Sequence, residues 1–518
     1  MYLTQPLHKA LLEVPERTAT VHGERRRSYR DLVSRVSRLA GGLRTLGLDA
    51  GDRVAILSLN SDRYMEAIYA TFWAGGVINP VNIRWSPKEI IYSLDDCDST
   101  ILMVDDTFLP LLEELRQGSR SLKTVIYAGD EAAPAGTQDF ETLIADSAPV
   151  ADAHRHGDDL AAVMYTGGTT GKPKGVMLSH TNLYIDGLGS QAVSGMPYRS
   201  VTLHAAPTFH VAGTGLILQA TARLNTSVII PMFEPLAVLR AIQQERILEA
   251  FLVPTMIRMV LSHPDFAQYD LSSLKHLLYG ASPIDSTLLN RAREALPQAR
   301  FLQAYGMTEL SPTVSILTPD WHTEEGFRSG KMMSAGRPLP MVEMRVVDDN
   351  DNPVPAHTRG EIVVRGPVVM QGYWNKPEQT EDALRGGWMH TGDAGYMDED
   401  GFVYVVDRIK DMIVTGGENV YSAEVEEAVL QLPQVAQCAV IGIPDDDWGE
   451  RVHAAVVLQD GGTLELDELM AHCKTLIANY KIPRSLEVRS ELPLSPAGKL
   501  LKYKLREEHW GGRERQVS

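Results

Sequence analysis

The chain has 518 residues, of which 44% are hydrophobic and 22% charged, and its formal net charge is −18. This length is too great for one compact core and predicts two to four domains, while the composition is that of a globular protein. The negative charge argues against non-specific nucleic-acid binding, which needs a basic face. No apolar run reaches membrane-spanning length. We therefore expect no nucleic-acid partner and no transmembrane segment.

Cysteine usage and the chain ends predict a cytoplasmic protein. Cys97, Cys438 and Cys473 lie far apart without metal-ligand spacing, which is typical of small buried hydrophobic residues in a reducing compartment. Residues 1–15 have no long apolar core preceded by positive charge, as a secretory signal would. The last four residues carry no lipidation or peroxisomal signal.

The first part of the chain alternates predicted helices and strands. Ser28 and Asp31 form a helix-start pair before apolar residues at helical spacing, and Ser86 to Glu89 form a capping box with proline at the first helical position. This alternation predicts an α/β fold with parallel sheets and helices on both faces. The predicted elements are helices at 28–46 and 62–74, a helix starting at 86–89, and strands at 53–59, 100–104 and 124–128.

Two changes of pattern follow. Residues 129–159 are rich in Ala, Pro, Asp and Gly and are predicted to be a surface connection, after which the alternation resumes to about residue 319. From 336 to 407 the pattern becomes short strands and turns, for example at 343–347 and 361–365. Such spacing predicts a β-rich, antiparallel part.

A last unit follows Arg408 and is long enough to hold its own small α+β core. Its predicted elements are a helix capped by Ser422 and ending at Leu430, strands at 437–443, 453–459 and 486–488, and a helix at 466–478. We therefore predict an N-terminal domain at 1–408 with a β-rich subdomain at 335–408, and a C-terminal domain at 409–518.

The glycine-rich stretch at 165–175 reads YTGGTTGKPKG and follows a predicted buried strand at 160–164. Glycine lets consecutive backbone N–H groups turn toward one point, where they form a hollow that binds anions. Threonine hydroxyls add donors, and Lys172 and Lys174 add positive charge. The ligand that suits this loop is a polyphosphate, and the alternative is a flexible loop without a ligand.

The loop does not fit the P-loop of nucleotide hydrolases. Gly167 and Gly171 are one residue too close, and Pro173 follows Lys172 where that motif has a serine or threonine to hold magnesium. A P-loop kinase or ATPase is therefore a poor interpretation.

Two predicted strands end in short turns at 278–283 (LYGASP) and 303–309 (QAYGMTE). Ligands of parallel sheets bind beyond the carboxyl ends of the strands. The small residues at 280–282 would admit a flat ring, and Tyr305 could stack on it. Thr308 could donate to a phosphate and Glu309 could hold magnesium. Either turn alone would be an ordinary strand–loop junction.

Four later segments are weak signals individually. Asp393 follows a Thr–Gly turn and could accept both hydroxyls of a ribose, or form an Asx turn. Residues 407–411 alternate charges at the domain junction, or form a solvated linker. Residues 415–419 are a second glycine turn or a hairpin, and 495–499 present one lysine, which could be an ordinary exposed side chain.

Together, in this order and spacing, these segments resemble the adenylate-forming (AMP-binding) superfamily of acyl-CoA synthetases, peptide-synthetase adenylation domains and luciferases. The resemblance covers 28–499. It implies that a carboxylate attacks the α-phosphate of ATP to give an acyl-adenylate and pyrophosphate, and that a thiol then displaces AMP to give a thioester. The cofactors implied are ATP and Mg²⁺, with coenzyme A as co-substrate.

The resemblance also implies roles for single residues. Lys499 would bridge the carboxylate and the α-phosphate, Glu309 would ligate magnesium and Thr308 would hold the α-phosphate. Most members have serine where Gly168 stands, and we expect a modest effect on ATP affinity because backbone donors remain. The ATP- and AMP-binding residues implied are Thr166, Gly167, Gly168, Thr169, Thr170, Gly171, Lys174, Gly280, Ala281, Ser282, Tyr305, Gly306, Asp393 and Arg408.

Members of this superfamily rotate the C-terminal domain between the two half-reactions. By position, Lys410 would be the hinge, while Gly416, Gly417 and Glu418 would line the coenzyme A channel. A lysine on a mobile domain suits a reaction that needs it in only one of two steps.

The acyl pocket implied by the resemblance includes Phe209, His210, Val211 and Gly213. Residues 209–214 lack the aspartate with which amino-acid-activating members pair the substrate ammonium, and a buried unpaired ammonium would cost roughly 3–5 kcal/mol. Residues 310–314 supply no basic group for a second carboxylate. We therefore expect a monocarboxylic acid with a fatty, medium-chain or aromatic tail.

The thiol is expected to be coenzyme A, because only 19 residues follow Lys499 and a carrier domain does not fit there. The main alternative is a stand-alone adenylation enzyme that loads a separate acyl-carrier protein. An adenylate oxidase of the luciferase kind and a nucleotide sensor that lost the chemistry are weaker alternatives. A homodimer is expected only from the superfamily.

Overall fold

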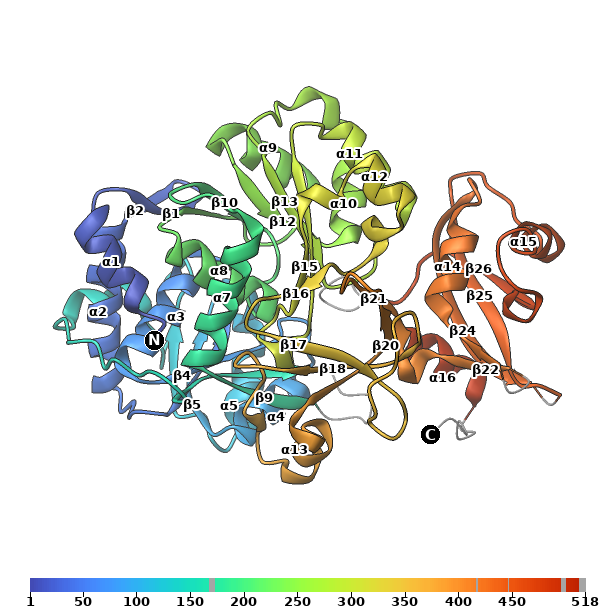
Figure 1. The fold of residues 1–518 in the computed structure, drawn as a ribbon. Coiled ribbons are helices and arrows are strands. Elements are labelled where there is room, and N and C mark those ends of the chain that lie inside the picture. Colours follow the sequence, from blue (N-terminus) through green and yellow to red (C-terminus); the bar gives the residue numbers. More distant parts are fainter. Residues whose placement is uncertain (167–172, 416–417, 446, 495–499, 512–518) are drawn as a thin grey trace.

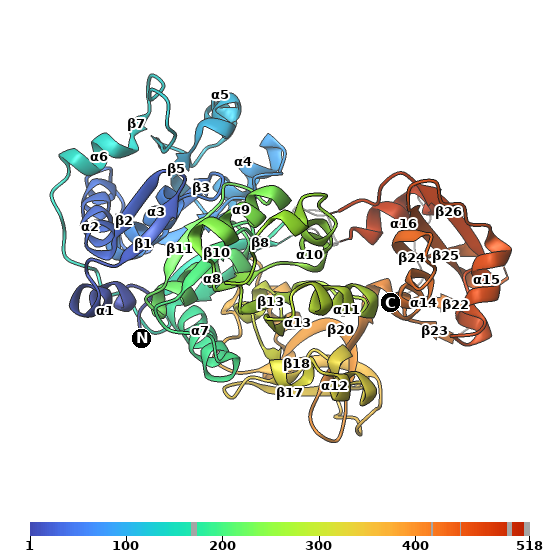
Figure 2. The same cartoon turned by 90° about the horizontal axis from the view of Figure 1, so that it is seen from above.

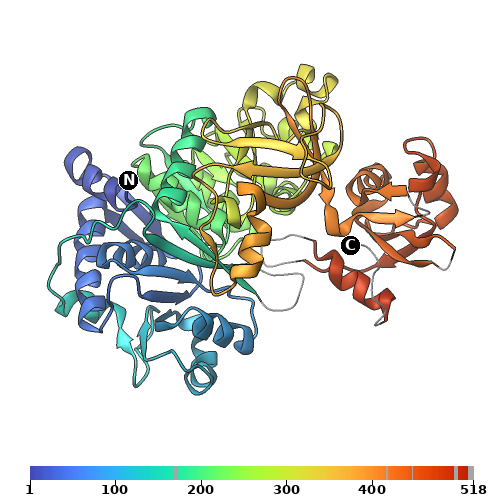
Figure 3. The same cartoon turned by 60° about the horizontal axis from the view of Figure 1, so that its bottom comes forward.

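The computed structural model describes residues 1–166, 173–415, 418–445, 447–494 and 500–511. Figure 1 shows a large part formed by the blue, green, yellow and light-orange residues, with a smaller deep-orange-to-red part at its side. Figure 3 shows the smaller part as a separate lobe when the molecule is tilted.

Two large, mostly parallel sheets form the frame of the large part. The first has the order β16 (Arg337–Pro338), β15 (Ser315–Leu317), β14 (Arg300–Tyr305), β13 (His276–Gly280), β12 (Glu249–Phe251), β10 (Val201–His204), β11 (Thr226–Ile229), β1 (Thr18–His22) and β2 (Arg25–Ser28). The second has the order β19 (Gly372–Tyr373), β9 (Lys174–Ser179), β8 (Leu160–Thr166), β4 (Val77–Pro80), β3 (Arg53–Leu57), β5 (Ser99–Val104), β6 (Thr124–Tyr127) and β7 (Gln138–Asp139).

Two smaller sheets complete the chain. An antiparallel sheet has the order β17 (Glu343–Val347), β18 (Gly360–Arg365), β20 (Met389–Met397) and β21 (Val403–Arg408). The sheet of the C-terminal lobe has the order β23 (Glu418–Val420), β22 (Ile413–Thr415), β25 (Gly449–Leu458) and β24 (Val435–Asp445), and β26 (Ser485–Arg489) pairs with β25. The predicted class, α/β with parallel sheets, a β-rich part and a small C-terminal α+β part, is confirmed.

Helices cover these sheets, and α7 and α8 lie against each other in Figure 2. None of the helices in the described ranges is long and apolar enough to cross a membrane. The helices are α1 (Gln5–Glu13), α2 (Tyr29–Thr45), α3 (Asp62–Ala74), α4 (Pro87–Asp96), α5 (Leu112–Gly118), α6 (Phe140–Asp146), α7 (His180–Ser194), α8 (Val211–Ala222), α9 (Pro235–Glu245), α10 (Pro254–Leu261), α11 (Ser286–Ala295), α12 (Glu324–Arg328), α13 (Pro377–Ala383), α14 (Ser422–Leu430), α15 (Leu466–Cys473) and α16 (Lys502–Trp510).

The predicted helix starts are confirmed where the signal is local. At α2 the Asp31 backbone N–H donates to Ser28 Oγ at 3.1 Å, and the Ser28 N–H donates to the Asp31 carboxylate at 3.1 Å. The same reciprocal pattern starts α4, with Ser86 and Glu89. Each capping box satisfies backbone donors that a helix start leaves unpaired. The three cysteines are free and buried, as predicted.

Three predicted elements differ from the structure. The connection at 129–159 contains β7 and α6, because Phe140 and Ile144 are apolar enough to pack into the main core. Ser422 does not cap α14 but is its first residue, and its N–H donates to Asp407 at 2.6 Å. Helix α15 ends at Cys473 because the N–H groups of Thr475 and Leu476 bond three residues back, which tightens the turn.

The apolar cores of the two parts are distinct. Two core clusters contain only residues from Ile413 onward, and the others contain only residues before it. The boundary between residues 408 and 409 remains a prediction, since a core cluster does not fix where a hinge lies.

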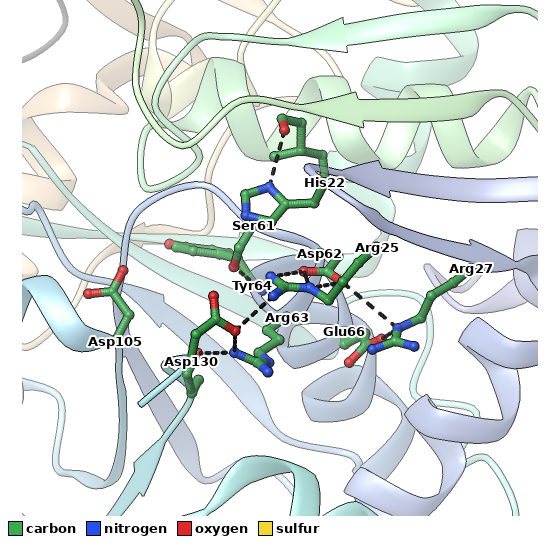
Figure 4. Close-up of polar contacts among 12 residues, drawn as sticks. His22, Arg25, Arg27, Ser61, Asp62, Arg63, Tyr64, Glu66, Asp105 and Asp130 are labelled. Carbon is green, nitrogen blue, oxygen red and sulfur yellow. Dashed lines mark hydrogen bonds and ion pairs between the residues drawn. The ribbon is translucent and has the colours of Figure 1, made fainter. Parts of the chain in front are cut away.

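A network of ion pairs fastens β2 and the 129–159 connection to α3 (Figure 4). Arg25 Nη2 lies 2.9 Å from Oδ1 of the fully buried Asp62, and Arg25 Nη1 lies 2.8 Å from Asp130 Oδ1. Arg63 Nη1 lies 2.7 Å from the same Asp130 oxygen and also donates to the Gly129 carbonyl at 2.6 Å. The connection is therefore held by buried cations at its start.

Candidate active site

The two predicted strand-end turns lie side by side, because β13 and β14 are parallel neighbours in register. Glycine is required at both turns. A Cβ at Gly280 would lie 2.2 Å from the Ala304 carbonyl oxygen, and one at Gly306 would lie 1.9 Å from the Pro312 carbonyl oxygen. Ala281 adopts φ of 65°, a left-handed conformation that non-glycine residues rarely adopt and that is frequent at functional sites.

Three predicted residues from three strands, Asp393, Arg408 and Tyr305, contact one another through the Asp393 carboxylate. Arg408 stands opposite Asp393 across β20 and β21, and its Nε lies 2.7 Å from Asp393 Oδ1. The Tyr305 hydroxyl donates to Asp393 Oδ2 at 2.7 Å. Burial acts to lower the pKa of Arg408, but Asp393, Tyr305, Glu309 and Asp411 together outweigh it and the pKa is raised. Arg408 and Tyr305 therefore hold the two oxygens of Asp393 in a fixed orientation.

Glu309 lies in a short 3-10 turn, Thr308–Leu310, and its side chain is buried near one tyrosine and two cations. Burial raises the pKa of Glu309, whereas the charges of Arg408 and Lys174 lower it. The Tyr373 hydroxyl donates to Glu309 Oε1 at 3.0 Å, and Lys174 Nζ lies 4.7 Å from the centre of the Tyr373 ring. A buried carboxylate next to cations is a suitable hard ligand for magnesium.

Tyr373 is a site residue that sequence reasoning missed. It lies on the short strand β19, which pairs with β9 so that Tyr373 stands opposite Val176. This pairing places its hydroxyl at Glu309, 64 residues away in the chain. The sequence offered only a Gly–Tyr pair without a charged residue to distinguish it.

The two ends of the glycine-rich loop are adjacent. Thr166 at the end of β8 stands opposite Lys174 at the start of β9. The predicted residues Gly167, Gly168, Thr169, Thr170 and Gly171 lie outside the described residues. Lys499, Gly416 and Gly417 lie outside them as well.

The predicted hinge, Lys410, lies in the short turn Ile409–Asp411 between β21 and β22. Burial lowers the pKa of Lys410. Burial also raises the pKa of its neighbour Asp411, but the cationic Arg506 and Lys502 outweigh this and the pKa is lowered. Arg506 of α16 lies 2.6 Å from Asp411 Oδ1, so the last helix contacts the hinge segment directly. Glu418 is exposed on β23.

The predicted acyl-pocket residues lie at the start of α8. His210 caps this helix by accepting from the Ala212 N–H at 3.4 Å, while Phe209, Val211 and Gly213 are buried. Sequence reasoning missed Asn60, which follows β3. Its side chain accepts from the Thr208 N–H at 2.8 Å and donates to the Ala206 carbonyl at 3.1 Å. Asn60 therefore joins the segment before α8 to the other sheet, and a polar residue directly after a buried strand was the available signal.

A cavity lies further along α8, against the strands that carry the two turns. Leu278 of β13 and Ala304 of β14 line it, next to the turns at Gly280 and Tyr305. The hydroxyl of Ser190 is buried and has no hydrogen-bond partner among the described residues. The lining residues are Ser190, Ser194, Met196, Thr202, Leu216, Gln219, Arg223, Glu249, Ala250, Leu278, Ala304, Thr313 and Ile316.

The four predicted acyl-pocket residues are not part of this lining, although Leu216 and Gln219 lie on the same helix. Arg223 Nη2 and Glu249 Oε1 form a buried ion pair of 2.7 Å that forms part of the wall. The cavity therefore combines apolar side chains with buried polar groups.

Sequence comparison agrees with this geometry. The sequence model of the AMP-binding enzyme family matches residues 7–374, and that of the AMP-binding enzyme C-terminal domain matches residues 424–499. The chain belongs to the AMP-binding enzyme family. The family membership that the ordered motifs predicted is thereby confirmed.

Curated relatives and solved structures of this family cover almost the whole chain. A feruloyl-CoA synthase of Amycolatopsis sp is 40% identical over 97% of both chains. The fatty acid–[acyl-carrier-protein] ligase ScoC of Streptomyces coeruleorubidus is 35% identical over 95% of this chain and 93% of its own. The anthranilate CoA ligase AuaEII, solved with anthranoyl-AMP, has a TM-score of 0.90 and 27% identity over 98% of this chain and 97% of its own.

The AMP-binding enzyme accordingly belongs with the acyl-CoA synthetases, which are AMP-forming ligases that work with ATP, Mg²⁺ and coenzyme A. The predicted enzyme class and cofactors are confirmed. The roles of the individual residues remain predictions, and they are treated as proposals below.

Proposed function

We propose that this enzyme activates an aromatic monocarboxylic acid that carries a hydrogen-bonding group at the far end of its ring, and transfers the acyl group to coenzyme A. The unpartnered Ser190 hydroxyl in the cavity beside β13 and β14 carries this proposal. An alkyl chain would leave that hydroxyl unsatisfied, at a cost of about 1–3 kcal/mol. A phenolic hydroxyl or an ether oxygen would satisfy it.

The similarity to other enzymes supports the same class of acid. The relatives named feruloyl-CoA synthase are 40% identical, whereas a long-chain-fatty-acid–CoA ligase of Mycobacterium tuberculosis is 32% identical. We therefore favour an aromatic acid over a fatty acid, within the monocarboxylic acids expected from the sequence.

In the first half-reaction, an oxygen of the acid attacks the α-phosphorus of ATP, and the bond to the bridging oxygen of the β-phosphate breaks. We assign adenine to the turn Gly280–Ser282 and the ring of Tyr305. Asp393 would accept hydrogen bonds from the ribose, because its contacts with Arg408 and Tyr305 orient its carboxylate. Thr308 would donate to the α-phosphate, and Lys499 would neutralise the two anions as they meet.

The glycine-rich loop would hold the phosphates that leave. Thr166 and Lys174, which stand opposite each other at its two ends, fix the width of its base. The backbone donors of 167–171 would bind the β- and γ-phosphates, and pyrophosphate would then be released.

Mg²⁺ would be held by the Glu309 carboxylate together with phosphate oxygens of the substrate. The residues present fit this ion, since Glu309 is a buried oxygen ligand oriented by Tyr373. Bound there, the ion supplies charge neutralisation for the phosphates. Tyr373 acts through Glu309 and is a positioning residue.

In the second half-reaction, the thiol loses its proton, its sulfur bonds to the acyl carbon, and the phosphate oxygen of AMP leaves. We assign the hinge to Lys410 and the pantetheine channel to Gly416, Gly417 and Glu418. The second candidate for the thiol is an acyl-carrier protein, which the similarity to ScoC favours. We also propose a cytoplasmic location, which the buried free cysteines support because they suit a reducing compartment. A homodimer is proposed from the superfamily alone.

A panel of acids scored for AMP formation, with and without coenzyme A, tests this function. Phenylpropenoic and benzoic acids with a ring hydroxyl or methoxy group should be turned over better than the same acids without it and better than fatty acids. Faster turnover of long-chain fatty acids would overturn the aromatic assignment. Acyl-adenylate that forms but transfers only to a carrier protein would favour the second candidate.

Replacing Ser190 by alanine should lower kcat/KM for ring-hydroxylated acids about fivefold, and should leave unsubstituted ring acids unaffected. The matched control is Ser194→Ala in the same cavity, because the Ser194 hydroxyl already accepts from the Met196 N–H at 3.3 Å. Competition between paired acids in one reaction measures the ratio. An equal loss for both acids would mean that Ser190 does not read the ring substituent.

A further inference from the structure

Three side chains that the proposed reaction does not use converge in the C-terminal lobe. His453 lies on β25, Glu487 on β26 and His509 on α16, elements that lie together in Figure 2. His453 Nε2 lies 3.6 Å and His509 Nε2 lies 3.7 Å from the same oxygen, Glu487 Oε2. All three atoms lie within 4.8 Å of one another.

These three atoms lack the partners that buried polar atoms normally have. Each is shielded from solvent, and each is without a hydrogen bond to any part of the chain that the structure describes. Their mutual distances are too long for hydrogen bonds. Three unsatisfied polar atoms pointing at one place are costly unless something else binds them, and an ion is a usual explanation.

Neighbouring groups fix the direction of two of the three ligand atoms, those of His453 and Glu487. His453 Nδ1 is engaged with Ser485 Oγ at 2.8 Å, which turns Nε2 toward the cluster. The other carboxylate oxygen of Glu487, Oε1, lies 2.9 Å from Arg489 Nε, which leaves Oε2 for the histidines. Arg489 is itself paired with Glu508, so its positive charge is balanced. Partners of this kind orient the ligands in metal sites.

We propose that His453, Glu487 and His509 bind one divalent transition-metal ion of the zinc class. Two imidazole nitrogens and one carboxylate oxygen are a set that zinc accepts, with water in the fourth position. Ligand atoms about 2.0–2.2 Å from a tetrahedral ion are about 3.3–3.6 Å apart. The two nitrogen–oxygen separations, 3.6 and 3.7 Å, need only a small contraction to reach that geometry, and the two histidine nitrogens lie within 4.8 Å of each other.

Such an ion would join three elements that are distant in the sequence. It would clamp α16 to the sheet of the lobe through His509, one helical turn beyond Arg506, which contacts Asp411. The site is separate from the magnesium site assigned to Glu309, whose ligands are oxygens.

A second cluster in the described residues, formed by His8, Asp152 and His154, does not share these properties. His8 Nε2 already hydrogen bonds to Asp152 Oδ2 at 2.7 Å, and the Thr4 hydroxyl donates to the same oxygen at 2.6 Å. This cluster carries no proposal, and it provides a matched control.

The test is a titration of the full-length, chelator-stripped enzyme with Zn²⁺ in excess Mg²⁺, followed by elemental analysis after gel filtration. We expect one zinc per chain, and with Co²⁺ an intense visible absorption typical of low coordination. Glu487→Gln and His509→Gln should lose this equivalent. Ser485→Ala should bind about 10–100-fold more weakly, as loss of an orienting partner does. His154→Gln should bind like the unmodified chain.

Two results would overturn the proposal. The first is an unmodified chain that takes up no zinc, which would make the cluster a metal-free ion pair. The second is zinc that is retained by both Glu487→Gln and His509→Gln, which would place it elsewhere. Circular dichroism of each variant shows whether a lost zinc reflects the ligand or the fold, and Ser485→Ala keeps all three ligands if a ligand variant is unstable.

Discussion

At the scale of single residues, the candidate site depends on how two buried acids are held. Asp393 is paired on both oxygens, by Arg408 and Tyr305, so it is ordered before any ligand arrives. Glu309 has a hydrogen bond from Tyr373 on one oxygen, and burial raises its pKa. The two acids therefore differ in a testable way, because Glu309 takes up a proton more easily than an exposed glutamate does.

We predict that adenylation has an acidic limb controlled by Glu309 and by magnesium. Only the ionised carboxylate binds the ion, so activity should fall as pH decreases through the raised pKa of Glu309. Because Mg²⁺ competes with the proton, higher Mg²⁺ should move this limb to lower pH. Pyrophosphate exchange measured over pH at several Mg²⁺ concentrations checks this. The same limb at every Mg²⁺ concentration would contradict it.

At the scale of elements, α3 is held by charges at its first turn. Asp62 is fully buried, accepts from Arg25 and also faces Arg27 at 3.8 Å, whereas Asp130 pairs with Arg25 from an exposed position. Removing a buried partner leaves cations uncompensated, while removing an exposed one costs little. The two acids of one arginine should therefore contribute very differently to stability.

We predict that Asp62→Ala lowers the free energy of unfolding by about 3 kcal/mol or more, as expected when one partner of a buried pair is removed. The matched control, Asp130→Ala, should cost less than about 1 kcal/mol, because that side chain is 64% exposed. Urea unfolding followed by tryptophan fluorescence measures the first transition of each variant. Equal losses would mean that the network acts as one unit.

Sequence reasoning succeeded where the information is local or periodic. The capping boxes at Ser28 and Ser86 involve residues three apart, and the alternating elements determine parallel sheets. The prediction failed at α6, because the polar composition of residues 129–159 indicated a surface connection although Phe140 and Ile144 pack into the core. Tyr373 reaches the site only through strand pairing, and Asn60 only through side-chain hydrogen bonds to the segment before α8. The cluster of His453, Glu487 and His509 was equally invisible, since its spacing in the chain follows no metal-binding pattern.

At the scale of the whole molecule, the larger part carries the acids of the candidate site and the lobe carries Lys499. The segment Ile409–Asp411, to which we assign the hinge, directly follows Arg408, the residue that pairs with Asp393. A catalytic cation on a separate lobe can be brought in for one step and withdrawn for the next. The two half-reactions should therefore respond differently to loss of that cation.

We predict that Lys499→Ala lowers adenylation about 100-fold or more, as loss of a group that stabilises developing charge does. Thioester formation from preformed acyl-adenylate should be largely retained. Lys504→Ala is the matched control, because Lys504 is exposed on α16 and should affect neither step. Separate assays of pyrophosphate exchange and of thioester release decide this, and an equal loss in both would contradict the two-position scheme.

The final helix has a consequence for how the protein is handled. Within α16, Arg506 neutralises Asp411 at the hinge, and Lys502 Nζ lies 2.8 Å from Glu426 Oε1 on α14. A version truncated before Lys502 would leave both anions without these cations, in a nearly dry environment. Helix α16 thus stabilises the segment around Asp411 through these ion pairs. An affinity tag is therefore better placed at the N-terminus, away from α16.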